Sequence, residues 1–251
     1  MRDAWRLAVG TLTALPVAAP RSVDRQVSGR AMVLAPLAAV PLGTLVAAVC
    51  WAGRELGLAP LAVAAVAIGM LAMGSRALHL DGLCDTADGL TASYDPARSL
   101  AVMKGGTAGP AGAAMLVVVL GVQAASLATV MLAPWGPVAA GLVVCCSRSA
   151  LVLACARGVR AARADGLGTG YAGTVARRGV AAVWLVTAAV LIGAAALADL
   201  PWWRGAMAAA VTLAVIGLLL VRCLRRFGGV TGDVFGAAIE LALATLLLTL
   251  T

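Results

Sequence analysis

The chain is short of charged residues. Asp, Glu, Lys and Arg make up only 12% of its 251 residues, whereas hydrophobic residues make up 62%. A soluble domain of this size usually carries about 25% charged residues, which keep its surface solvated. The shortage argues against a water-soluble protein and favours one whose outer surface contacts lipid.

Histidine and paired cysteine are scarce as well. The chain has a single His, and its six Cys contain no CxxC pair. Structural zinc sites combine several Cys and His at short spacings, so no zinc site is expected. Most of the cysteines lie in apolar runs, where Cys behaves as a small hydrophobic residue. We therefore predict no disulfide either.

What the chain has instead is a series of apolar runs rich in Ala, Val, Leu and Gly. Runs of about 20 residues match the hydrocarbon core of a bilayer, and small residues allow close helix packing there. Barrel strands are about 10 residues long and alternate apolar with polar residues, which these runs do not.

The sequence predicts an all-α, polytopic integral membrane helical bundle, with one membrane-embedded domain over residues 1–251. The seven expected spans are 31–52, 59–78, 108–133, 135–156, 179–200, 205–223 and 232–251. A Pro-broken apolar stretch at 7–19 predicts a short N-terminal helix that is interfacial or re-entrant.

The basic residues sort by side when these spans alternate across a membrane. Fourteen Lys and Arg fall in the segments on one side, and only Arg54 and Arg204 fall on the other. Because excess positive charge stays on the cytoplasmic side during insertion, the long loops 79–107 and 157–178 are predicted to be cytoplasmic. This topology explains most of the net charge of +8. The charge also suits an anionic substrate or anionic lipids, and no nucleic-acid partner is expected.

The acidic residues carry the clearest chemical signal. Three of the eleven fall within eight positions, Asp81, Asp85 and Asp88, in the segment HLDGLCDTADG at residues 79–89. On a helix these spacings bring the three carboxylates toward one face. Their mutual repulsion calls for a cation, and oxygen ligands favour Mg²⁺ or Mn²⁺. Gly82 and Gly89 are expected to leave room for a bulky ligand.

Two other functions fit parts of this pattern. Spaced aspartates at a membrane surface are similar to those of CDP-alcohol phosphotransferases, although the longer motif of those enzymes is absent. A divalent-cation transporter is the second alternative. A carrier needs ionisable residues at mid-membrane depth in several spans, whereas most acids here lie near one predicted surface.

The chain resembles the cobalamin synthases, or adenosylcobinamide-GDP ribazoletransferases. The resemblance rests on HLDGLCDTADG at 79–89, Met103-Lys104 before a Gly-rich stretch, GVTGDVFGA at 229–237 and TLTALP at 11–16. The acidic residue usual after Met-Lys in the family is missing. The resemblance implies a Mg²⁺-dependent transfer in an inner bacterial membrane, with the site facing the cytoplasm. In that reaction the 5′ oxygen of α-ribazole, or of its 5′-phosphate, attacks adenosylcobinamide-GDP, GMP leaves, and adenosylcobalamin or its 5′-phosphate forms.

Further candidate residues follow from the same segments. Asp233 is a candidate metal ligand or a helix cap, and Thr231 of the same motif is a candidate substrate contact. Glu240 and Arg148 lie inside predicted spans, where a charge is costly unless it is paired or functional. We expect them to pair with each other, as structure or as substrate contacts.

The single Lys and the single His complete the set. Lys104 is a candidate phosphate contact, or simply a cytoplasmic charge. His79 adjoins the carboxylates and is a candidate base, phosphate ligand or hydrogen-bond partner. The loop DGLGTGY at 165–171 is of a kind that covers a nucleotide, and a plain connecting loop is the alternative interpretation. The sequence leaves open whether the protein forms a homo-oligomer.

Overall fold

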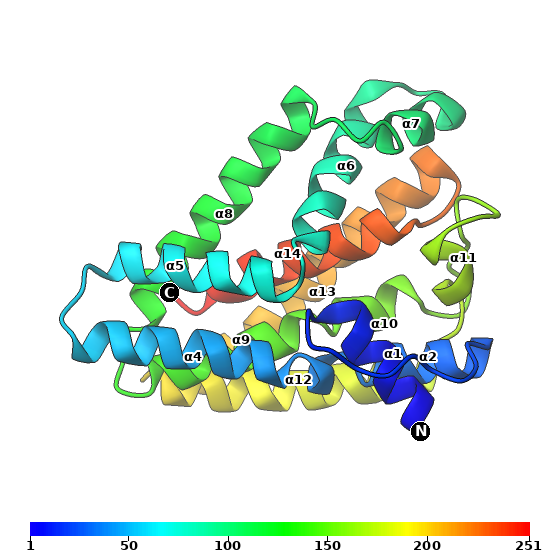
Figure 1. Cartoon of the computed structure of the whole chain (residues 1–251). Helices are drawn as coiled ribbons and strands as arrows, with labels where there is room; N and C mark the ends of the chain where they lie inside the picture. Colours follow the sequence, from blue (N-terminus) through cyan, green and yellow to red (C-terminus); the bar gives the residue numbers. More distant parts are fainter.

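The computed structural model describes all residues 1–251 and consists of fourteen α-helices without a strand (Figure 1). Five helical segments are long and apolar enough to cross a membrane. They are α8 (Pro110–Val130), Gly136–Ala154, α12 (Arg177–Leu197), α13 (Trp202–Phe227) and α14 (Gly232–Thr249). The second of these comprises α9 (Gly136–Ser147) and α10 (Ala150–Ala154). The prediction of a polytopic helical membrane protein is confirmed, although the candidate spans number five, or six with a broken helix, rather than the expected seven.

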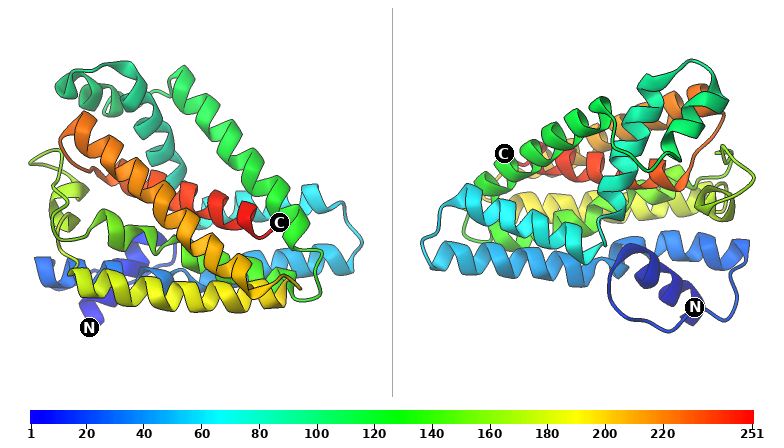
Figure 2. Two further views of the ribbon diagram at one scale, coloured as in Figure 1. Left: turned by 180° about the vertical axis from the view of Figure 1, so that it is seen from behind. Right: turned by 45° about the horizontal axis from the view of Figure 1, so that its top comes forward.

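The first predicted span, 31–52, is divided among three helices rather than forming one. Residues 25–55 form α2 (Arg25–Val33), α3 (Ala35–Ala38) and α4 (Val40–Glu55), which lie nearly end to end (Figure 2). Pro36 and Pro41 each stand at the start of a new helix. Because proline has no N–H to donate, it interrupts the helical hydrogen-bond ladder.

The second predicted span ends in a sharp bend. Helix α5 (Pro60–Gly74) meets α6 (Leu78–Ala92) at 92°, so the pair counts as a sixth span only if a broken helix is accepted. Arg76 and Ala77 adopt φ angles of 58° and 55° at the bend. This left-handed conformation costs an L-residue roughly 1–2 kcal/mol. The Arg76 guanidinium donates a hydrogen bond to the Gly10 carbonyl of α1 (Arg2–Leu12), so the N-terminal helix packs against the bend rather than lying apart from the bundle.

Helices α6 and α14 cross at very short range. A Cβ atom at Gly82 would lie 2.6 Å from the Asp233 carbonyl oxygen, and one at Gly236 would lie 2.9 Å from the His79 carbonyl oxygen. Glycine therefore lets the two backbones touch, as small residues do in membrane bundles. The expectation that Gly82 and Gly89 leave room for a ligand is wrong. Met103 and Phe227 side chains fill the space beside Gly89.

Asp88 caps a neighbouring helix. Its carboxylate is buried and accepts hydrogen bonds from the backbone N–H groups of Gly109 and Gly112, at 2.7 and 2.8 Å, in the first turn of α8. The start of an α-helix leaves N–H groups without partners and favours a negative charge. Asp88 meets both needs and fixes α8 against α6 across the intervening α7 (Pro96–Met103).

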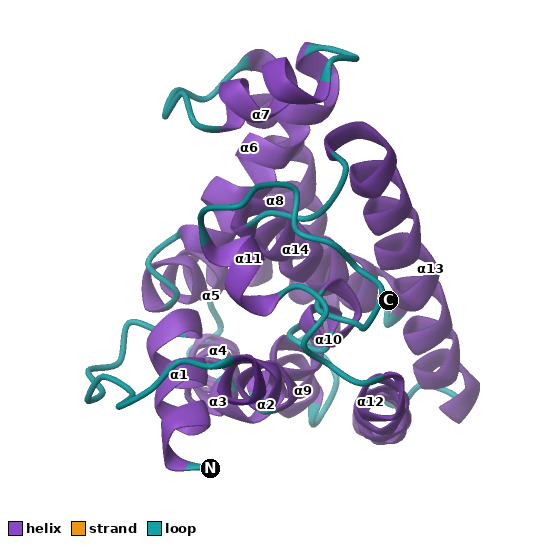
Figure 3. Cartoon of the chain, turned by 90° about the vertical axis from the view of Figure 1, so that its right-hand side faces the viewer, coloured by secondary structure: helices purple, strands orange, loops and turns teal.

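The two ends of the bundle differ in their basic residues. The turns 56–59, 131–135 and 198–201 lie at one end with Arg54 and Arg204 (Figure 1). There the Arg54 guanidinium donates to the Ala133 and Pro134 carbonyls at 2.7 and 2.9 Å. The basic loop that contains α11 (Leu167–Tyr171) lies at the opposite end, beside the start of α14 (Figures 1 and 3).

We expect Gly82→Ala to lower stability, because its methyl group would collide with the Asp233 backbone. Overpacking of this kind typically costs about 1–3 kcal/mol. Gly217→Ala is the matched control, since no atom lies within 4 Å of a Cβ at that helical position. Thermal unfolding in detergent measures both, and equal midpoints would contradict the close crossing.

We also expect Asp88→Ala to destabilise the protein by about 1–3 kcal/mol, because the substitution leaves two backbone N–H groups at the start of α8 without a hydrogen-bond acceptor. Asp95→Ala removes an exposed cap of α7, which accepts from Ala97 N–H at 3.1 Å, and should cost less. If Asp95→Ala lowers the thermal unfolding midpoint more than Asp88→Ala does, the buried cap does not contribute more stability than the exposed cap.

Candidate functional site

The α6–α14 crossing brings the two sequence motifs together at a cavity of about 120 Å³, called here the apolar cavity. His79 and Asp81 come from α6, and Asp233 comes from α14. The remaining wall is mostly apolar and comes from six helices. Its residues are Thr11, Leu12, Met32, Leu78, Leu151, Leu167, Tyr171, Gly232, Phe235, Gly236 and Ile239.

A second cavity of about 170 Å³, called here the polar cavity, adjoins the first. The two share Leu167, Gly232 and Asp233. The other lining residues of the polar cavity are Arg163, Asp165, Gly166, Gly168, Val230 and Thr231. Two glycine-containing loops and one guanidinium therefore meet beside the carboxylates.

Backbone pairing holds these loops in place. Val230 N–H donates to the Arg160 carbonyl at 2.8 Å, and Ala162 N–H donates to the Val230 carbonyl at 2.9 Å. The Arg163 guanidinium also donates to the Leu100 carbonyl of α7 at 3.0 Å. The cavity walls are thus joined to three separate parts of the chain.

Lys104 lies outside both cavities. Its ammonium group is 3.1 Å from a carboxylate oxygen of Asp165, and both side chains are exposed. The hydrogen bond and charge of Lys104 hold the pKa of Asp165 below its usual value. This surface pair links the loop after α7 to the loop DGLGTGY, so both flank the mouth of the site.

The predicted carboxylates separate into two groups. Asp85 lies within electrostatic range of Asp81, Asp88 and Asp233, with Arg163 as the nearby positive charge. Asp88 directs its oxygens at the start of α8 instead. No three His, Cys, Asp or Glu side chains lie close enough together to form a complete metal site by themselves.

The donor set still fits a hard divalent cation. The carboxylates of Asp81, Asp85 and Asp233 supply oxygen ligands and lie within electrostatic range of one another, with Arg163 as the nearby positive charge. Mg²⁺ is usually held by one or two carboxylates together with substrate phosphates and water, rather than by a full protein cage. These residues therefore suit a cation that arrives with a phosphate-bearing substrate.

Thr231 begins helix α14 and fixes its first turn. Its hydroxyl accepts a hydrogen bond from Val234 N–H at 3.4 Å and donates one to the Asp233 carboxylate at 3.0 Å. Asp233 thus reaches the cavities from a helix start, where a negative charge is favoured. Asp233 therefore lies both in the first turn of a helix and in the wall of the two cavities.

Glu240 pairs with a different residue from the one expected. Its carboxylate accepts a hydrogen bond from the Gln123 amide at 2.8 Å and lies 3.8 Å from His79 Nδ1. Arg148 lies within electrostatic range of Glu240 but forms no ion pair with it, so the predicted direct pair is wrong. Arg148 donates instead to the Val144 carbonyl and the Ser147 hydroxyl, at 3.0 and 2.8 Å. Neither Glu240 nor Arg148 lines the apolar or the polar cavity.

Sequence reasoning missed four residues of this region. The sequence marks Arg163 only as a cytoplasmic charge, although it lies two residues before the start of the DGLGTGY loop. Gln123 is the single amide in a largely apolar span, which is a usable signal. Tyr171 and Phe235 lie in two Gly-containing motifs of a chain with only two Tyr and two Phe, and that scarcity is the signal.

Comparison with known proteins covers nearly the whole chain. The family model described as cobalamin-5-phosphate synthase matches residues 4–251. A Nocardioides protein called adenosylcobinamide-GDP ribazoletransferase is 57% identical over 248 residues, covering 99% of this chain and 98% of the relative. Relatives of the same name from Frankia casuarinae and Pseudomonas aeruginosa are 38% and 36% identical, over 98% and 100% of this chain and 93% and 99% of their own. No solved structure matches. The chain belongs to the cobalamin-5-phosphate synthase family.

Proposed function

We propose that this protein transfers the adenosylcobinamide-phosphate group from adenosylcobinamide-GDP to α-ribazole or its 5′-phosphate, with release of GMP. The relative that is 57% identical over nearly the full length carries this activity in its name, and that likeness is the main support. The paired cavities add a chemical reason, because they combine carboxylates with a basic, glycine-lined wall. Neither the CDP-alcohol reaction nor cation transport has comparable support.

The polar cavity is the proposed site of the pyrophosphate. Arg163 supplies a planar guanidinium that matches phosphate oxygens. The loops at 165–168 and 230–232 place backbone beside it, and glycine backbone admits close approach of an anion. Lys104 and Asp165 lie at the rim, where they are positioned to close over the bound nucleotide.

Asp81, Asp85 and Asp233 are the proposed ligands of Mg²⁺, or of Mn²⁺ in its place. When bound, the cation would neutralise the pyrophosphate and stabilise GMP as the leaving group. We assign Asp88 to the scaffold, because its oxygens bind the start of α8.

The proposed attack starts from a ribose hydroxyl of the acceptor. The product of the phosphorylated acceptor keeps its 5′-phosphate, so its 5′ oxygen is already esterified. Because the two products differ only by that phosphate, another ribose oxygen must attack in both cases, and not the 5′ oxygen expected from the sequence. The new P–O bond forms as the bond to GMP breaks, and the hydroxyl proton passes to a base. His79 and Asp81 both line the apolar cavity and are the candidates to accept that proton.

We further propose that the site faces the cytoplasm of a bacterial cell whose inner membrane holds the bundle. The end of the bundle that carries the cavities is the end with most of the Lys and Arg. Positive residues remain on the cytoplasmic side during insertion, and nucleotide substrates are made there.

The reaction is tested by GMP release. Purified protein in liposomes, given adenosylcobinamide-GDP and α-ribazole 5′-phosphate, should release GMP together with a cobalamin product. Chelation of divalent cations should stop the release, and Mg²⁺ should restore it. Folded protein that releases CMP from CDP-diacylglycerol and an alcohol, but no GMP, would overturn the proposal.

The carboxylates are tested by Asp81→Asn. We expect GMP release to fall by at least about a thousandfold, on the order of 4 kcal/mol of transition-state stabilisation, with an unchanged thermal midpoint. Asp199→Asn is the matched control, because Asp199 lies in the turn at the opposite end with φ of 56°, which Asn tolerates. Near-normal turnover by the Asp81 variant would remove this residue from the mechanism.

A further inference from the structure

Half of the chain's Tyr and Phe residues line the apolar cavity. The chain has only two Tyr and two Phe, and Tyr171 and Phe235 both line this cavity. Their ring centroids are 6.3 Å apart with an interplanar angle of 90°, an edge-to-face pair. Both side chains are buried in the protein, at 5% and 7% exposure.

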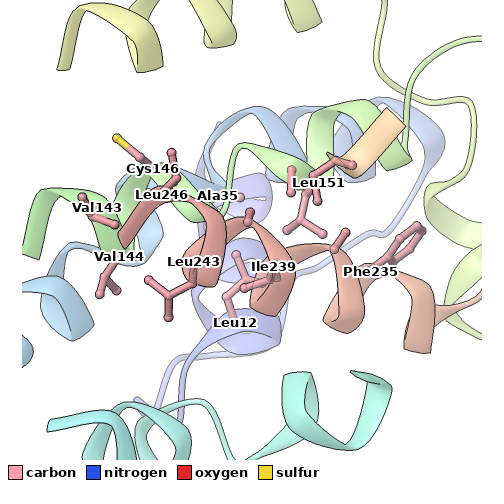
Figure 4. Packing of buried hydrophobic residues seen from close by; sticks show 14 of the residues in the cluster. Leu12, Ala35, Val143, Val144, Cys146, Leu151, Phe235, Ile239, Leu243 and Leu246 are labelled. Atoms are coloured by element: carbon pink, nitrogen blue, oxygen red, sulfur yellow. The ribbon is translucent and has the colours of Figure 1, made fainter. Parts of the chain in front are cut away.

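The rest of this wall is aliphatic. Leu12, Leu151 and Ile239 come from α1, α10 and α14 and line the same cavity as Phe235, which precedes Ile239 along the same helix (Figure 4). Met32 of α2 also lines the cavity, and a thioether packs favourably against aromatic rings. Such a wall favours a flat, weakly polar ring.

The cavity is polar at one end. Asp233 lines both cavities, and Asp81 and His79 lie across the Gly82 crossing from it. A ligand with a flat ring and a polar tail would therefore place its ring among Tyr171 and Phe235 and its tail at the carboxylates. A nucleoside with an apolar base has this shape.

We propose that the apolar cavity binds the benzimidazole base of α-ribazole, with Tyr171 and Phe235 as residues that determine acceptor specificity. This inference rests on the proposed transfer reaction. Binding the base there places the ribose hydroxyls beside His79 and Asp81, next to the pyrophosphate in the polar cavity. The order of the two cavities then matches the order of the reacting groups.

The other ring systems of the substrates fit this cavity poorly. Guanine carries hydrogen-bond donors and acceptors around its edge, and an aliphatic wall would leave them unpaired at a cost. The corrin ring is far larger than a cavity of about 120 Å³. The donor therefore enters through the polar cavity, with its corrin outside.

The test compares two conservative variants, Phe235→Leu and Phe227→Leu. Phe227 is also buried, but it packs beside Gly89 and lines neither cavity. Equilibrium dialysis of α-ribazole and the KM values for both substrates are measured for each variant and for wild type. Phe235→Leu should weaken α-ribazole binding and raise its KM about three- to tenfold, the range for losing an aromatic contact. The KM for adenosylcobinamide-GDP should change less than about twofold, and Phe227→Leu should leave both KM values unchanged.

Competition tests the assignment without any variant. Free 5,6-dimethylbenzimidazole should displace α-ribazole from wild-type protein, and GDP should not. Displacement by GDP, or a Phe235→Leu effect on the donor KM alone, would overturn the assignment. If Phe235→Leu weakens α-ribazole binding while wild type releases no GMP, the base site is supported and the transfer reaction is overturned.

Discussion

The site depends on one contact, the close crossing of α6 and α14. Gly82 and Gly236 let the two backbones approach within van der Waals distance, and no other residue type fits without displacement. The crossing sets Asp81 and His79 of one motif against Asp233 of the other. Every proposed role in the cavities depends on this juxtaposition, because the two motifs are separated by about 150 residues in the chain.

Buried polar groups fix the register of the helices around that crossing. Glu240 of α14 is bonded to Gln123 of α8 and lies near His79 of α6, while Asp88 of α6 caps α8. In a membrane the helices gain little from hydrophobic association, and an unpaired buried charge is costly. These contacts therefore allow a single arrangement of the three helices, since sliding any one of them would leave charged or amide groups without partners.

The two cavities divide the chemistry between charge and shape. Arg163 and the loop backbones offer positive charge and donors to an anion, while the wall around Tyr171 and Phe235 offers apolar surface. Asp233 lies between them, at the start of α14. Its carboxylate is held by Thr231 at 3.0 Å, so the boundary between the two environments is a fixed point rather than a mobile side chain.

The sequence by itself determined the membrane class, most helix positions, the sorting of charge between the two ends and the importance of residues 79–89 and 229–237. These properties follow from local composition and spacing, which need no knowledge of packing. Only the tertiary structure decided which side chains meet. In the structure Asp88 caps α8, and Glu240 is hydrogen-bonded to Gln123 rather than paired with Arg148. Tyr171 and Phe235 line one cavity. Contacts between distant segments depend on helix crossing angles and on a strained bend at Arg76 and Ala77, and no periodicity in the chain encodes either.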